Sequence, residues 1–143
     1  MGKYIASTSK WVRDQVELYE KSKGKEGNTV SNYPVIIVTN LGRNTGAIRK
    51  TPLITVKDDD KYILIASQGG SPKNPNWYYN LKANPKVKIQ DGSTVYNMKA
   101  TEILDPKKRK RLWEIAVKTY NPYQDYQSRT ERIIPIFLAT PIK

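Results

Sequence analysis

The chain has 143 residues, a length that predicts one domain with a single hydrophobic core. It contains no cysteine and no histidine, which excludes disulfide bonds, thiolate or histidine-ligated metal sites and serine–histidine hydrolysis. The 25 lysines and arginines against 13 aspartates and glutamates give a net charge of +12, which favours an anionic partner. We expect a bound cofactor to supply any chemistry, and we expect no metal.

Hydrophobic patterning predicts three helices. The first covers residues 9–22, followed by a glycine-containing linker, and its apolar face would carry Trp11, Gln15, Leu18 and Tyr19. The second covers residues 76–83, after the start signal Asn74-Pro75, and the third begins at the capping pair Asp105-Pro106.

The same patterning predicts six strands, over residues 34–40, 51–57, 61–67, 86–90, 93–103 and 133–140. Their mostly antiparallel order indicates a mainly β fold of the α+β class. Closing the sheet removes its exposed edges, so we expect a small six-stranded β-barrel with flanking helices. We divide the chain into an N-terminal helix and linker, residues 1–30, and a barrel domain, residues 31–143.

The sequence shows no apolar run near the roughly 20 residues of a membrane span and no secretory signal. We therefore expect a cytoplasmic location.

A basic loop with two glycines, residues 41–50, lies between the first two predicted strands. Its N–H groups can converge on an anion, while Arg43 and Arg49 can bind phosphate oxygens through planar guanidinium groups. Hydroxyl groups of Thr45 and Thr51 would add donors. The loop matches neither the P-loop nor the dinucleotide-binding fingerprint, and an ordinary exposed hairpin is the alternative.

A diglycine follows the third predicted strand, in the sequence Ala66-Ser67-Gln68-Gly69-Gly70. At the two glycines the backbone can lie flat against a ring system. The helix that starts nearby would favour negative charge at its N-terminus. The alternatives are a simple turn and, for Trp77, a place in the core.

Three tyrosines, Tyr120, Tyr123 and Tyr126, recur at intervals of three around Pro122, where we expect a helix end or loop. They can line one wall of a pocket, offering ring faces and phenolic donors, and they can donate protons in a chain without histidine. Interior packing is the alternative.

Five consecutive cations, residues 107–111, open the third helix. The run is similar to nucleic-acid-binding patches, but a solvated helix face is favoured. Cations oppose the helix dipole at this end, so we expect an anionic group nearby.

Three stretches together, VTNLGRNTGAIRKTPL, ASQGG…KNPNWYYNLKANPKV and TYNPYQDYQSRTERIIPI, resemble the deazaflavin-dependent nitroreductase family of actinobacterial split-barrel oxidoreductases. The resemblance covers residues 34–140. It implies a split β-barrel of the FMN-binding type that binds coenzyme F-420, an 8-hydroxy-5-deazaflavin with a phosphate and a γ-linked glutamate tail. That ligand is polyanionic, which suits the charge of the chain.

The resemblance also implies roles for particular residues. The catalytic residues would be Ser67, Tyr120, Tyr123 and Tyr126. The cofactor-binding residues would be Arg43, Asn44, Thr45, Gly46, Arg49, Thr51, Leu53, Ala66, Ser67, Gln68, Gly69, Gly70, Asn76, Trp77 and Tyr123.

Two positions depart from the family pattern. Gln68 stands where close relatives often carry a lysine, so one ionic contact would be lost. Ile54 stands where members that activate nitro drugs carry a tyrosine, which predicts poor activation of bicyclic nitroimidazoles.

The expected activity is hydride transfer from reduced coenzyme F-420 to a quinone such as menaquinone or to a nitro-type acceptor. The alternatives are a split-barrel reductase that uses FMN and a non-enzymatic basic module that binds nucleic acid or acidic membranes. The tyrosines lie apart from the cation run, so we expect no nucleic-acid partner. Peripheral contact with the inner membrane face and the oligomeric state stay open.

Overall fold

The computed structural model describes residues 2–142, and within them the chain forms four α-helices and eight β-strands. The helices are α1 (Lys10–Lys21), α2 (Asn76–Ala83), α3 (Pro106–Thr119) and α4 (Pro122–Ser128). The strands are β1 (Thr29–Val30), β2 (Tyr33–Leu41), β3 (Ile48–Ile54), β4 (Lys57–Asp58), β5 (Lys61–Ile65), β6 (Lys86–Asp91), β7 (Thr94–Glu102) and β8 (Ile136–Pro141), and a short 3₁₀ turn, η1 (Gln68–Gly70), follows β5.

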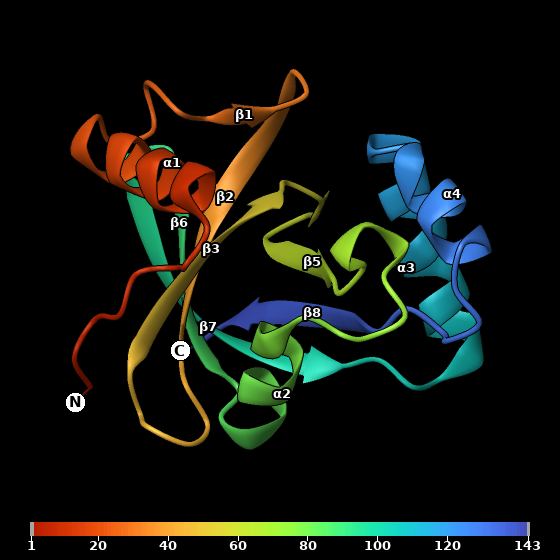
Figure 1. Ribbon diagram of the computed structural model, residues 1–143. Helices are drawn as coiled ribbons and strands as arrows, with labels where there is room; N and C mark the ends of the chain where they lie inside the picture. Colours follow the sequence, from red (N-terminus) through yellow and green to blue (C-terminus); the bar gives the residue numbers. More distant parts are fainter. Residues whose placement is uncertain (1, 143) are drawn as a thin grey trace.

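All pairs of neighbouring strands are antiparallel, in the order β1-β2-β6-β7-β8-β5-β4, with β3 on the other edge of β2. The chain segment from β3 to β4 therefore pairs with β2 at its start and with β5 at its end, which curls the sheet into a half-barrel. Figure 1 shows α1 on one side of this sheet and α3 and α4 on the opposite side.

The continuous apolar run in β2 is buried on both faces. Ile36 and Val38 face the barrel interior, whereas Val35 and Ile37 face outward and pack against α1. Val16 and Tyr19 form the buried face of α1, while Trp11 and Leu18 are exposed, so the predicted apolar face of this helix is wrong in part.

A second core lies between the sheet and the C-terminal helices. The outward side chains of β5 and β8 pack against Leu112 and Ala116 of α3 and against Tyr123 of α4. The inward side chains of the same strands join Trp77 and Leu81 of α2 in the barrel core. The alternating strands thus have apolar partners on both faces.

The α+β class is confirmed, but the predicted count of six strands is wrong. Two of the strands, β1 and β4, have only two residues: β1 lies in the predicted linker, and β4 begins at the last residue of the predicted strand 51–57. Pairing with longer neighbours, not hydrophobic patterning, forms them. The strand β3 also begins within the predicted basic loop, because its ladder with β2 continues to the pair Leu41 and Ile48.

The fourth helix, α4, occupies the tyrosine-rich segment that we expected to be a helix end or loop. Pro122 stands at its first position, where the missing N–H costs nothing. Within residues 2–142, no helix has both the length and the apolar character needed to cross a membrane.

Candidate active site

A cavity of about 530 Å³ opens beside β3, the loop after β5, α2 and the tyrosines of α3 and α4. Of the residues that we predicted for the site, eleven line it: Arg49, Thr51, Leu53, Ser67, Gln68, Gly69, Asn76, Trp77, Tyr120, Tyr123 and Tyr126. These residues come from three sequence segments that the fold brings to one place.

One wall of the cavity is the strand β3. Arg49, Thr51 and Leu53 line it at alternate positions, and alternate side chains of a strand share a face. The guanidinium of Arg49 and the hydroxyl of Thr51 supply hydrogen-bond donors. Leu53 packs on the barrel core, so this wall is cationic at one end and apolar at the other.

The loop after β5 forms a second wall and has an unusual backbone. Gln68, Gly69 and Gly70 all have positive φ, of 45°, 63° and 82°. A glutamine in the left-handed region is strained, and such strain concentrates at functional sites. At Gly70 a Cβ atom would lie 2.6 Å from the backbone oxygen of Tyr126, so only glycine lets this loop approach α4.

Tyrosines form the third wall. The hydroxyls of Tyr120 and Tyr126 lie 3.0 Å apart in a hydrogen bond, and the rings of Tyr120 and Tyr123 meet edge to face at 4.8 Å. Burial, with the hydrogen bond to Tyr126, raises the pKa of Tyr120 to about 12. Burial also raises the pKa of Tyr123. Both phenols are therefore protonated at neutral pH and can donate.

The model of the F-420H(2)-dependent quinone reductase family matches residues 11–141. This chain belongs to that family. Membership confirms an oxidoreductase family that uses reduced coenzyme F-420, in agreement with the resemblance of the sequence motifs.

Named relatives agree. A protein of Mycobacterium tuberculosis, named an F-420H(2)-dependent quinone reductase, is 37% identical over 127 residues, which cover 86% of this chain and 85% of the relative. A solved F-420-H2 dependent reductase (FDR-A) has a TM-score of 0.70 and 42% identity, and covers 75% of this chain and 94% of its own.

A second solved structure, described as a domain-swapped dimer, has a TM-score of 0.73 and 40% identity, and covers 94% of this chain and all of its own. A candidate pyridoxamine 5′-phosphate oxidase from Listeria innocua shares 14% identity at a TM-score of 0.53 over 76% of this chain and 84% of its own. That likeness concerns the fold alone.

The cavity of this family member fits a planar, polyanionic coenzyme. Its volume lies in the range of small-molecule sites. A Cβ at Gly69 would meet nothing within 4 Å, so a ring can approach the backbone there. Arg49 lines the same cavity and supplies positive charge for a phosphate or carboxylate tail, whereas the ammonium of Lys50 is paired with Glu20 of α1 at 2.6 Å.

Six predicted cofactor-binding residues do not line the cavity. Arg43, Asn44 and Thr45 lie in the exposed turn after β2, and the Thr45 hydroxyl accepts a hydrogen bond from the Ala47 N–H at 3.1 Å. The others are Gly46 in the same turn, Ala66 in the barrel core and Gly70 behind Gly69. Their contacts with the coenzyme stay predictions.

Several cavity residues escaped the sequence reasoning. Ser7, Trp11 and Val12 line the cavity from the N-terminal segment, which we had set apart from the barrel. Asn80 lines it from α2, and an asparagine in a short helix is usually taken as a surface residue. Arg132 was also missed: it lies in the third family-like stretch, but the carbonyls it binds belong to the loop after β5, far away in the sequence.

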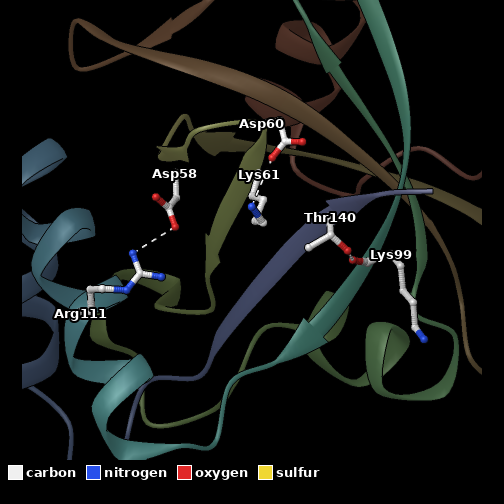
Figure 2. A network of polar contacts seen from close by, with 6 residues as sticks. All are labelled: Asp58, Asp60, Lys61, Lys99, Arg111 and Thr140. Carbon is white, nitrogen blue, oxygen red and sulfur yellow. Dashed lines mark hydrogen bonds and ion pairs between the residues drawn. The ribbon is translucent and has the colours of Figure 1, made fainter. Parts of the chain in front are cut away.

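The cation run of the reductase, residues 107–111, lines no part of the cavity, and all of it is exposed except the half-buried Arg109. Arg111 pairs with Asp58 of β4 at 3.1 Å (Figure 2), and the Asp105 carboxylate caps the helix by accepting from the Lys108 N–H. These two carboxylates are the anionic groups expected near this helix end.

Proposed function

We propose that this chain transfers hydride from reduced coenzyme F-420 to a quinone, with both molecules in the cavity described above. The observation that carries the proposal is the lining of one cavity by a strand that carries Arg49, a glycine-bearing loop and hydroxyl-bearing tyrosines. The strand and the loop suit a flat anion, and the tyrosines suit an acceptor that must take up a proton.

The binding roles follow from the charges. Arg49 would bind the phosphate or glutamate tail, and Gln68 and Gly69 would lie along the ring. These contacts provide affinity and orientation rather than a lower barrier. When bound, the coenzyme supplies a two-electron hydride from its deazaflavin ring.

The tyrosines would complete the reaction. Reduction of a quinone to a hydroquinone takes one hydride and one proton. Tyr126 would donate the proton to the quinone oxygen, the hydrogen-bonded Tyr120 hydroxyl would replace it, and solvent would return a proton to the pair before the next turnover. Ser67, buried beside the same cavity, would orient the acceptor.

Two finer points belong to the proposal. Ile54 lines the cavity where nitro-activating members of the family carry a tyrosine, so nitroaromatics would be poorer acceptors than quinones.

The exposed Trp11, also on the cavity lining, supports a peripheral contact with the membrane that holds long-tailed quinones.

Fluorescence titration with coenzyme F-420, beside FMN as the control ligand, tests cofactor choice. We expect saturable binding of coenzyme F-420, and selective binding of FMN would overturn the proposal.

Turnover with a quinone panel then tests the role of the tyrosines in proton transfer. Tyr126→Phe should lower kcat roughly 100-fold with the coenzyme Kd unchanged, and an unaltered kcat would remove Tyr126 from the mechanism.

A further inference from the structure

Arg132, in the segment between α4 and β8, donates four hydrogen bonds to the single loop of residues 66–74. Its Nε donates to the Ser71 oxygen at 2.8 Å and its Nη2 to the Ser67 oxygen at 2.7 Å. Its Nη1 donates to the Ala66 oxygen at 3.1 Å and to Asn74 Oδ1 at 2.6 Å. One planar guanidinium therefore fixes both ends of this loop.

No carboxylate forms an ion pair with Arg132 in the part of the chain that the structure describes. Its charge is compensated by the dipoles of the loop carbonyls instead. Partial burial lowers the pKa of Arg132, yet a guanidinium remains charged at neutral pH. A fixed positive charge thus lies on the side of the loop to which the Ala66 and Ser67 carbonyls point.

The same hydrogen bonds set the direction of the loop N–H groups. In a planar trans peptide the N–H points opposite to the carbonyl. Because the Ala66 and Ser67 carbonyls turn toward Arg132, the N–H groups of Ser67 and Gln68 point away from it. Ser67, Gln68 and Gly69 line the cavity, and their three N–H groups have no partner within residues 2–142.

The carbonyl paired with the Gly69 N–H is that of Gln68, which accepts from the Ser71 N–H at 3.1 Å, so the turn itself orients this third N–H. Three successive N–H groups in this conformation have the geometry of an anion-binding nest. Ser67 is right-handed, while Gln68 and Gly69 are left-handed. The change from right-handed Ser67 to left-handed Gln68 makes the consecutive N–H groups converge on one point. The strained φ of Gln68 is then maintained by the four hydrogen bonds of Arg132.

Gln127 of α4 fixes Arg132 in turn. Its Nε2 donates to the Arg132 oxygen at 2.8 Å, and its Oε1 accepts from the Ile134 N–H at 3.0 Å. Tyr126, the neighbour of Gln127, lies against Gly70. The loop of residues 66–74 and the tyrosine wall are therefore connected through the Gln127 side chain, which fixes Arg132.

We infer that Arg132 is a positioning residue that presents the N–H groups of Ser67, Gln68 and Gly69 to an electron-rich edge of the coenzyme ring. The inference rests on the proposed function, since it assigns the means by which this cavity holds the ring.

The experiment compares the full-length chain with Arg132→Gln, Arg132→Lys and Asn74→Ala. Arg111→Gln is the matched control, because the Arg111 guanidinium pairs with Asp58 of β4 and neither residue lines the cavity. Coenzyme Kd by fluorescence, quinone KM and thermal unfolding are measured for each. Amide NMR spectra follow Ser67, Gln68 and Gly69 as coenzyme is added.

We expect Arg132→Gln to raise the coenzyme Kd about tenfold, the effect of losing charge-assisted hydrogen bonds, while the quinone KM changes by less than about twofold. Arg132→Lys should restore part of the affinity, since an ammonium cannot reach four acceptors in one plane. Asn74→Ala should raise Kd about two- to threefold, and Arg111→Gln should leave it unchanged. In the wild type, all three amide resonances should shift on binding.

A folded Arg132→Gln that binds coenzyme like the wild type overturns the inference and leaves the proposed function intact. A wild type that binds no coenzyme overturns the proposed function itself. Should Arg132→Gln fail to fold, Asn74→Ala and the amide shifts decide, and an unchanged Kd with unshifted amides overturns the inference.

Discussion

Asn80 on α2 holds Arg43, in the turn after β2, through one oxygen atom. Asn80 Oδ1 accepts from the backbone N–H of Arg43 and from its Nη1, both at 3.0 Å. The guanidinium also lies over the Tyr79 ring, 5.1 Å from its centre. Because Asn80 is only 6% exposed and lines the cavity, this contact fastens the basic turn to the helix that supports the site.

Replacing Asn80 should therefore cost stability. Asn80→Ala leaves a partly buried N–H without its acceptor, and we expect the free energy of unfolding to fall by about 1–3 kcal/mol. Urea unfolding measures it. Asn84→Ala, at the end of the same helix, is the comparison variant, and an equal loss in both variants would contradict a specific role for Asn80.

Arg49 and Arg43 should differ in their effect on coenzyme binding. Arg49 lines the cavity, whereas Arg43 is held by Asn80 outside it. Arg49→Ala should raise the coenzyme Kd about ten- to hundredfold and flatten its salt dependence. Arg43→Ala should raise it less than about threefold. Titrations at low and high ionic strength check both, and the reverse order would show that the turn after β2 binds the tail.

Stability should decline at alkaline pH because of Tyr120. Its pKa is raised from 10.0 to about 12 by burial first, so the folded state holds this proton more tightly than the unfolded state. The resulting stabilisation is complete below pH 10.0 and is lost between 10.0 and about 12. Urea unfolding across this window should give a steeper decline for the wild type than for Tyr120→Phe, and parallel curves would contradict the shift.

Gln68→Lys should strengthen coenzyme binding. The residue is exposed and lines the cavity, so a lysine here could meet an anionic group of the coenzyme. A partly exposed ion pair with an anionic ligand should lower Kd about two- to fivefold at low salt. Gln68→Glu should weaken binding, and equal affinities for the two variants would show that this side chain does not face the coenzyme.

Removal of residues 1–30 tests the predicted domain boundary. The truncation exposes Val35 and Ile37, which α1 covers, so we expect a loss of about 3–6 kcal/mol in unfolding free energy. It also removes Trp11 and Val12 from the cavity. Differential scanning calorimetry gives the comparison, and a truncated chain as stable as the full one would confirm an independent barrel domain.

The longer elements could be predicted from local patterns. The run from Val35 to Val38 has apolar partners on both faces, which produces the uninterrupted hydrophobic signal of a central strand. Asp105-Pro106 marks the start of α3 because capping is a local interaction. In contrast, β1 and β4 are two-residue strands that pair with the next strand along the chain, Val30 opposite Tyr33 and Asp58 opposite Lys61. Two residues are too few to show the alternation by which a strand is predicted.

The residues that would bind the coenzyme or donate a proton could also be predicted from the sequence. Arg49, the residues from Ser67 to Gly69 and the three tyrosines stand in motifs whose residue types suit an anionic ring and a proton donor. Composition reinforced them, since a chain without histidine or cysteine leaves tyrosine as the hydroxyl acid and a cofactor as the source of electrons.

The tertiary structure alone decided which of these residues share one cavity and what holds them there. Arg132 reaches a loop about 60 positions earlier in the chain, Asn80 reaches back to Arg43, and Trp11 borders a site built mostly by residues after position 48. The residues next to each of these side chains in the sequence do not predict such contacts. Residue type determines what a group can do, but only packing between distant segments determines which groups meet.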